Sequence, residues 1–170
     1  MQKDTVIDYA AVNIDDPVLL DWSLDGKYLC LASLGRSGIW VVDFQSNKVI
    51  RSLDVDSDGT PNCVWSPSGD FLIAESKDQL LTIWDTSNWQ IRNSFKVSGG
   101  DLRDISWRND EKFVAISGDL GVQIWNVGTG NFIIVQSERS HTAVWNTEGT
   151  MIATDLNNQI HIWDVANLPN

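Results

Sequence analysis

Seven of the nine tryptophans in this 170-residue chain recur at an interval of about forty residues. One series heads turn-like stretches (WSLDG, WSPSG, WRNDE and WNTEG) and consists of Trp22, Trp65, Trp107 and Trp145. A second series closes β-rich runs, as VVD, IWD, IWN and IWD, and its last residues are Asp43, Asp85, Asn126 and Asp164. Two series that keep the same interval indicate four copies of one supersecondary unit.

Each copy has the pattern of short strands separated by turns. In the second copy the expected strands are residues 60–65, 71–74, 80–84 and 90–95. They are rich in β-branched and aromatic residues, and Gly, Pro, Asn, Asp and Ser separate them, as in Pro67-Ser68-Gly69. No stretch has a convincing helical period. The sequence therefore predicts an all-β fold.

These motifs resemble the WD-repeat family of β-propellers, in which a repeat of about forty residues builds a four-stranded blade. The most specific motif is Ile-Trp-Asp with an acid six residues before the tryptophan, as Asp78 precedes Trp84 and Asp119 precedes Trp125. No copy has the Gly-His pair that usually opens a family repeat, and Asn157 replaces the turn acid in the fourth copy. The resemblance implies a WD-repeat-like propeller with four four-stranded blades. It also implies that the family's hydrogen-bond network of His, Ser or Thr, Trp and Asp is incomplete.

The repeats define a single propeller unit over residues 1–170, with copies at approximately 10–53, 54–95, 96–135 and 136–170. The fourth copy ends after its third strand, and residues 5–9 form a strand-like segment before the first copy. We expect residues 5–9 to supply the outer strand of the last blade, within one chain or across two. WD-repeat rings usually have seven or eight blades, so the sequence predicts a homodimer forming an eight-bladed ring, or half of a larger propeller.

The charge balance bears on partners. Twelve basic and 23 acidic residues give a net charge of −11, which opposes binding to phosphate backbones and makes nucleic acid an unfavourable partner. A basic peptide or protein face fits this charge, although acidity also simply keeps proteins dispersed. No apolar run approaches the ~20 residues of a membrane helix, and the first residues do not read as a secretory signal. Cys30 and Cys63 lack metal or redox spacing, so we expect a cytoplasmic protein.

Catalytic motifs are not evident. Gly35-Arg36-Ser37-Gly38 lacks the spacing of a nucleophile elbow, and Gly128-Thr129-Gly130 lacks the third glycine of a dinucleotide site. Neither His141 nor His161 has a ligand partner at useful spacing, and His161, between Ile160 and Ile162, is expected to point off the buried face of its strand. The sequence predicts a protein that is not an enzyme and has no cofactor.

The two tryptophan series are expected in the core, because their positions repeat from blade to blade. Trp40 and Trp89 fall outside both series. We expect these two to be the most exposed tryptophans, and so candidates for partner contact.

One segment offers a metal site. Asp54, Asp56 and Asp58 alternate and are followed by Gly59, an arrangement that can place oxygen ligands around Ca²⁺. Position twelve of this loop is Trp65, where the helical calcium loop needs Glu, so only the looser Asp-x-Asp-x-Asp-Gly loop remains. The other reading is a solvated acidic connector.

The resemblance implies a non-catalytic protein–protein interaction scaffold, with a calcium-stabilised ligand- or peptide-binding propeller as the alternative. In the family pattern, partners meet the turns between second and third strands and the starts of inner strands. The corresponding residues here are Arg36, Lys77, Arg103, Asp104 and His141.

Overall fold

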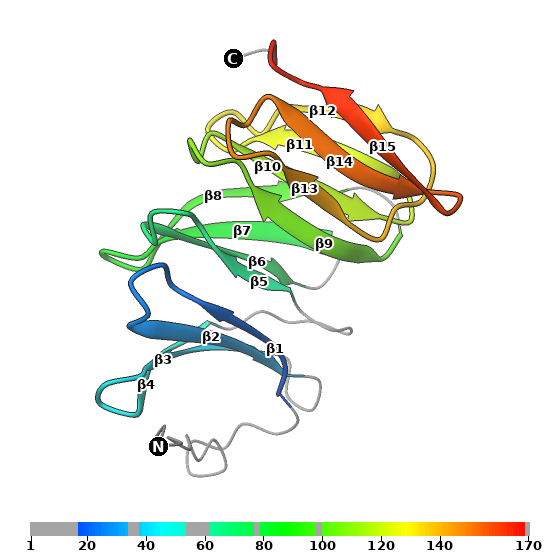
Figure 1. Ribbon diagram of the computed structural model, residues 1–170. Helices are drawn as coiled ribbons and strands as arrows, with labels where there is room; N and C mark the ends of the chain where they lie inside the picture. The colour runs from blue at the N-terminus through cyan, green and yellow to red at the C-terminus, as the bar shows by residue number, and fades with distance from the viewer. Residues whose placement is uncertain (1–16, 34–37, 54–61, 77–78, 98–99, 169–170) are drawn as a thin grey trace, which may run out of the picture.

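The computed structural model describes residues 17–33, 38–53, 62–76, 79–97 and 100–168. Their strands form four antiparallel sheets, three of four strands and one of three, and each sheet is built from consecutive strands (Figure 1). We call these sheets blades 1 to 4. The prediction of an all-β, WD-type propeller architecture is confirmed. No described helix is long and apolar enough to cross a membrane.

The bounds of the strands are as follows. Blade 1 contains β1 (Pro17–Trp22), β2 (Tyr28–Ser33), β3 (Gly38–Asp43) and β4 (Lys48–Leu53). Blade 2 contains β5 (Cys63–Trp65), β6 (Phe71–Ser76), β7 (Leu80–Asp85) and β8 (Gln90–Lys96). Blade 3 contains β9 (Leu102–Trp107), β10 (Phe113–Gly118), β11 (Gly121–Asn126) and β12 (Phe132–Gln136). Blade 4 contains β13 (Ala143–Trp145), β14 (Met151–Leu156) and β15 (Gln159–Asp164). Residues 5–9, the expected closing strand, lie outside the described residues, so their role stays a prediction.

The acid or amide that closes each third strand has a local structural role. Its side-chain oxygen accepts a backbone N–H two or three residues later, which fixes the turn that follows the strand. The four bonds measure 2.8 Å from Ser46 to Asp43, 2.9 Å from Ser87 to Asp85, 3.0 Å from Gly128 to Asn126 and 3.0 Å from Ala166 to Asp164. This bond explains why aspartate or asparagine recurs at this position in every copy.

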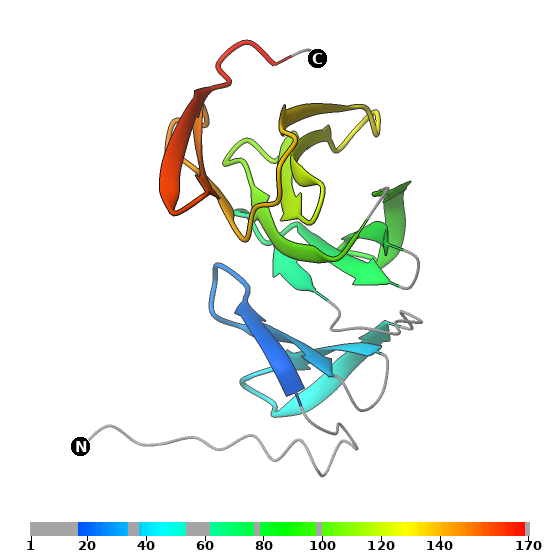
Figure 2. The same ribbon diagram turned by 90° about the vertical axis from the view of Figure 1, so that its right-hand side faces the viewer.

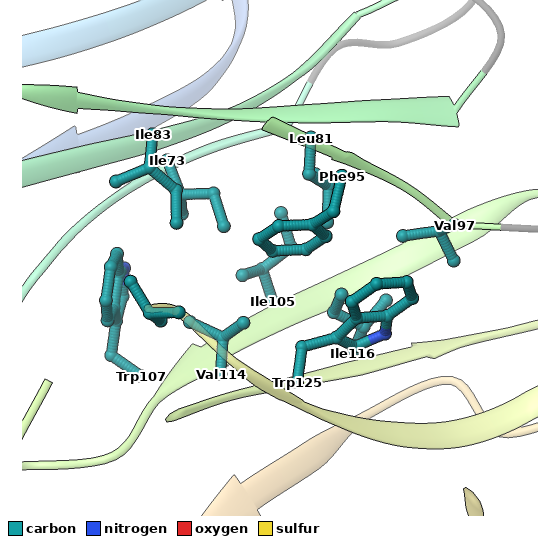
Figure 3. Packing of buried hydrophobic residues seen from close by; sticks show 11 residues of the cluster. Ile73, Leu81, Ile83, Phe95, Val97, Ile105, Trp107, Val114, Ile116 and Trp125 are labelled. Atoms are coloured by element: carbon teal, nitrogen blue, oxygen red, sulfur yellow. The ribbon is translucent and has the colours of Figure 1, made fainter. Parts of the chain in front are cut away.

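Successive blades pack face to face and form an open arc from blade 1 to blade 4 (Figures 1 and 2). The joint between blades 2 and 3 brings Ile73, Leu81 and Ile83 against Trp107 and Val114, as Figure 3 shows. Similar clusters join blade 1 to blade 2 and blade 3 to blade 4. Blades 2 and 3 thus each bury one face against the blade before and the other against the blade after, whereas blades 1 and 4 each bury one face in this way.

A hydrogen bond repeats at every joint. In blades 2, 3 and 4, the indole N–H of the first-series tryptophan donates to a backbone carbonyl of the preceding blade. The accepting residue comes directly before the first-series tryptophan of that preceding blade. The donor–acceptor distances are 3.2 Å for Trp65 to Asp21, 3.4 Å for Trp107 to Val64 and 3.1 Å for Trp145 to Ser106. These tryptophans therefore fix one blade on the next, which accounts for the first tryptophan series in the sequence.

Candidate interaction site at the rim of blades 3 and 4

Charged side chains gather where the β10–β11 turn of blade 3 meets the segment that leads into β13. Asp119 in that turn lies 3.4 Å from Arg103 of β9 and 3.4 Å from Arg139 of the leading segment. The backbone N–H of Asp101 also donates to the Asp119 carboxylate. These donors, the Asp101 N–H first, hold the pKa of Asp119 below its usual value. Asp119 thus connects the two blades at their rim.

Asp155, on β14, anchors the leading segment of blade 4. Its Oδ1 accepts hydrogen bonds from the Ser140 hydroxyl at 2.8 Å and from the backbone N–H groups of His141 and Thr142 at 2.7 and 3.0 Å. Its Oδ2 lies 2.9 Å from Nδ1 of His141. The pKa of Asp155 lies well below its usual range. The His141 side chain is the largest cause, and the Ser140 hydroxyl and these backbone donors add to it. One carboxylate therefore fixes three consecutive residues.

The structure brings three of the predicted partner-binding residues into this network. Arg103 pairs with Asp119, His141 with Asp155, and Asp104 accepts a 2.7 Å hydrogen bond from the Thr142 hydroxyl. The other two, Arg36 and Lys77, lie outside the described residues. The role of all five in binding stays a prediction.

A hollow of about 350 Å³ opens beside this network, with acidic and amide side chains in its wall. Arg139 and His141, both exposed, are part of its lining. The lining residues are Glu138, Arg139, His141, Asp155, Leu156, Asn157 and Asn158.

The Ser140, His141 and Asp155 side chains do not have the order of a nucleophilic triad. In a triad the serine proton goes to the histidine, and the carboxylate contacts the other ring nitrogen. Here both Ser140 and His141 are bonded to Asp155, and Ser140 is fully buried. The arrangement holds a loop in place rather than activating a hydroxyl.

Gln136, at the end of β12, has a structural role that the motifs did not reveal. Gln136 is buried, and its amide oxygen accepts a 2.7 Å hydrogen bond from the Thr154 hydroxyl. The Thr154 hydroxyl oxygen in turn accepts a 2.9 Å hydrogen bond from the indole N–H of Trp163. The Gln136 amide nitrogen donates to the carbonyls of Glu138 and Asp155. Gln136 and blade 4 thus form a Gln–Thr–Trp chain of hydrogen bonds, whereas the resemblance implied only that the family's network is incomplete. No pattern in the sequence marked this glutamine.

The tryptophans outside the two series are not the most exposed ones, so that prediction is wrong. Trp40 packs beside the cluster of Leu29, Leu31 and Val42, and Trp89 packs on the joint of blades 1 and 2, edge-on to Trp65. Trp22 is the exposed member, since no described blade precedes blade 1.

The expectation for β15 is wrong for the same reason. Ile160 and Ile162 are exposed, whereas His161 is partly buried and stacks on Trp163. The alternation of the strand is as expected, but no described blade covers the face that the isoleucines occupy.

The metal-binding candidates Asp54, Asp56 and Asp58 lie outside the described residues. Within the ranges that the structure describes, no group of three or more His, Cys, Asp or Glu side chains could hold a metal ion. The calcium site therefore stays a prediction.

Comparison with known proteins agrees with the repeat pattern. The family model "WD domain, G-beta repeat" matches residues 40–85. Protein HIR1 of Cryptococcus neoformans var. neoformans serotype D is 30% identical over 111 residues, covering 62% of this chain and 12% of that protein. The p21-activated protein kinase-interacting protein 1-like of Gallus gallus is 24% identical over 144 residues, covering 83% of this chain and 38% of that protein.

A chain in the crystal structure of a mitotic checkpoint complex superposes with a TM-score of 0.73 at 19% identity, covering 91% of this chain and 49% of that chain. Human F-box-like/WD repeat-containing protein TBL1Y is 23% identical over 114 residues, covering 66% of this chain and 21% of that protein. The chain spans less than half the length of each of these proteins. The repeated motifs, the bladed architecture and these similarities agree: the chain contains a WD repeat at residues 40–85 and has the fold of a WD-type β-propeller.

Proposed function

We propose that this chain is a non-catalytic protein-interaction scaffold that receives its partner at the rim of blades 3 and 4. The observation that carries the proposal is the anchoring of residues 140–142 by Asp155, which leaves Arg139 and His141 exposed on a fixed backbone. A preorganised loop loses little conformational freedom on binding, so more of the contact energy appears as affinity. The WD-repeat relatives support the same kind of role.

The chemistry of the rim favours a basic partner. Glu138 and Asp155 line the hollow with the amides of Asn157 and Asn158, and Asp101, Asp104 and Asp119 stand on the same rim. Arg139 and His141 also line the hollow and Asp155 is already bonded to His141, so a lysine or arginine side chain of the partner would pair with Glu138. The chain's net charge of −11 would also speed encounter with a basic surface.

The test uses a labelled peptide of alternating arginine and serine, and a second in which glutamate replaces arginine. Fluorescence anisotropy should show binding of the basic peptide only. Glu138→Lys should weaken it about tenfold, the effect of ~1.4 kcal/mol. Glu148→Lys is the matched control, because Glu148 is exposed in the β13–β14 turn at the opposite end of the blade. If the control variant loses binding and Glu138→Lys keeps it, the partner face lies at the other end of the blades.

We also propose that two chains associate as a homodimer that closes an eight-bladed ring; half of a larger propeller is the alternative. The open arc supports association, because apolar blade faces in water favour contact with another surface. A cytoplasmic location is proposed as well. Its support is that Cys30 and Cys63 are both free and buried, as expected in a reducing compartment.

Calcium stabilisation by Asp54, Asp56 and Asp58 remains the second candidate function. Calcium bound only to the folded chain would raise the melting temperature by mass action. We expect millimolar calcium to cause this rise if the site exists, and Asp56→Ala to abolish it. Equal melting curves with calcium and with chelator would remove this candidate.

A further inference from the structure

The last blade exposes a face that every other blade buries. Ile160 and Ile162 of β15 are 78% and 62% exposed. Their counterparts by position in β7, Leu81 and Ile83, are 0% exposed and pack on blade 3 (Figure 3). The counterparts in β11, Val122 and Ile124, are equally buried against blade 4. Val144 and Met151 extend the exposed face of blade 4.

The first blade exposes the opposite half of the same joint. Trp22 and Leu20 of β1 are 46% and 59% exposed. The counterparts of Trp22 in the next two blades, Trp65 and Trp107, are 5% and 7% exposed, because each packs on the blade before it. Trp22 has no preceding blade among the described residues; it touches Phe44 edge-on at 5.3 Å.

The two end faces match each other residue by residue. In all three internal joints, the counterparts of Ile160 and Ile162 share a hydrophobic cluster with the counterparts of Leu20 and Trp22. In all three joints, the indole N–H of a first-series tryptophan donates to the backbone carbonyl of Asp21, Val64 or Ser106 in the preceding blade. The residue at this position in blade 4 is Val144. The arc therefore ends in the donor half of a joint at blade 1 and the acceptor half at blade 4.

We infer that the occupant of each end face is the opposite end face of a second copy of this chain. In this joint Ile160 and Ile162 pack on Leu20 and Trp22 of the second copy, and the Trp22 indole donates to the Val144 carbonyl. The inference rests on the proposed pairing and specifies its joint as head-to-tail. A two-fold axis then produces two identical joints and leaves no end face open.

A second copy supplies both missing neighbours at once, which a single-sided partner does not. The arc also has the right size, because it covers 49% of the WD-fold chain that it superposes on. Two arcs of this length therefore correspond to about one chain of that fold.

The experiment measures particle mass by light scattering at micromolar concentration. We expect about twice 19.0 kDa for the wild type and 19.0 kDa for Ile160→Lys. Ile160 is exposed in the single chain, so this variant should keep the wild-type circular dichroism spectrum; Ile162→Lys provides a second variant on the same face. Ile134→Lys is the matched control, because Ile134 is 60% exposed on the outer strand β12, away from both end faces. It should keep the double mass.

A charge swap tests the head-to-tail geometry. Leu20→Glu alone should also have a mass of 19.0 kDa. An equimolar mixture of Ile160→Lys and Leu20→Glu should recover the double mass, because one joint then pairs Lys with Glu and the other is wild type. A wild-type mass of 19.0 kDa, or a mixture that stays at that mass, would overturn the inference.

Salt separates this inference from the proposed rim function. Each chain carries a net charge of −11, so added salt should strengthen pairing through apolar faces by screening repulsion. Binding of the arginine–serine peptide at the rim should weaken with salt. If the chains do not pair but the peptide still binds in a Glu138-dependent way, only the inferred joint is contradicted. If the chains pair but the peptide does not bind, only the proposed rim function is contradicted.

Discussion

At the residue scale, the spacing of the tryptophans predicted their positions but not their exposure. Trp65 and Trp107 lie in joints as expected, whereas Trp22 has the same sequence context and lies exposed. Burial of a blade residue depends on the neighbouring blade, and spacing within the chain carries no information about a neighbour beyond its ends. The same limitation reversed the expectation for Ile160 and Ile162.

Glu75 is a residue whose charge state should affect stability near neutral pH. Burial, with a contribution from Asp101, raises its pKa to about 7, although the Asn62 side chain donates a 3.1 Å hydrogen bond to it. A folded-state pKa above the unfolded one means that the folded protein binds the proton more tightly. The stabilisation is therefore complete below the ordinary pKa of 4.5 and is lost as the pH rises through 7.

Glu75→Gln removes this dependence. Between pH 5 and pH 8, the free energy of unfolding of the wild type should fall relative to that of the variant, by about 2 kcal/mol after allowance for partial solvation. Urea unfolding at several pH values measures the difference. Glu138→Gln, a substitution of an exposed glutamate, keeps Glu75 and should therefore follow the pH profile of the wild type. Parallel pH profiles for the wild type and Glu75→Gln would contradict the raised pKa.

At the element scale, the strands and their closing turns followed from the sequence, since Asx-type turns need an acid or amide at a fixed place. The hydrogen-bond networks of Gln136 and Asp155 did not follow from the sequence. Gln136 and Asp155 act across elements, and their partners Thr154 and Ser140 are identified only once the strands are paired. Such contacts leave no local pattern in a single sequence.

The start of β11 gives an element-scale prediction. Gly121 has φ of 93°, and a Cβ there would collide with the backbone carbonyl oxygen of Gln136. Gly121→Ala should therefore separate β11 from the end of β12 and cost more than about 2 kcal/mol of stability. Gly26→Ala is the control, because Gly26 also has positive φ but open space around its Cα, so only about 1 kcal/mol of backbone strain is expected. Equal melting temperatures for the two variants would show that the close approach does not matter.

At the scale of the whole molecule, the repeat interval was sufficient to predict a WD-type arc of blades, and the structure confirms it. The ends of the arc could not be predicted in the same way, because closure depends on surfaces brought together after folding. The rim of blades 3 and 4 could be predicted in part. Arg103, Asp104 and His141 were placed there by the family pattern, but the anchoring by Asp155 became visible only in the folded chain.

Hydrogen–deuterium exchange with the arginine–serine peptide tests the scaffold function most directly. On addition of the peptide, amides in residues 138–142 and in the β14–β15 turn should exchange more slowly, because the partner covers the hollow that they line. Amides of the β13–β14 turn, at the opposite end of blade 4, should not change. Protection of that turn, with no change in residues 138–142, would contradict the assignment of the rim as the partner face.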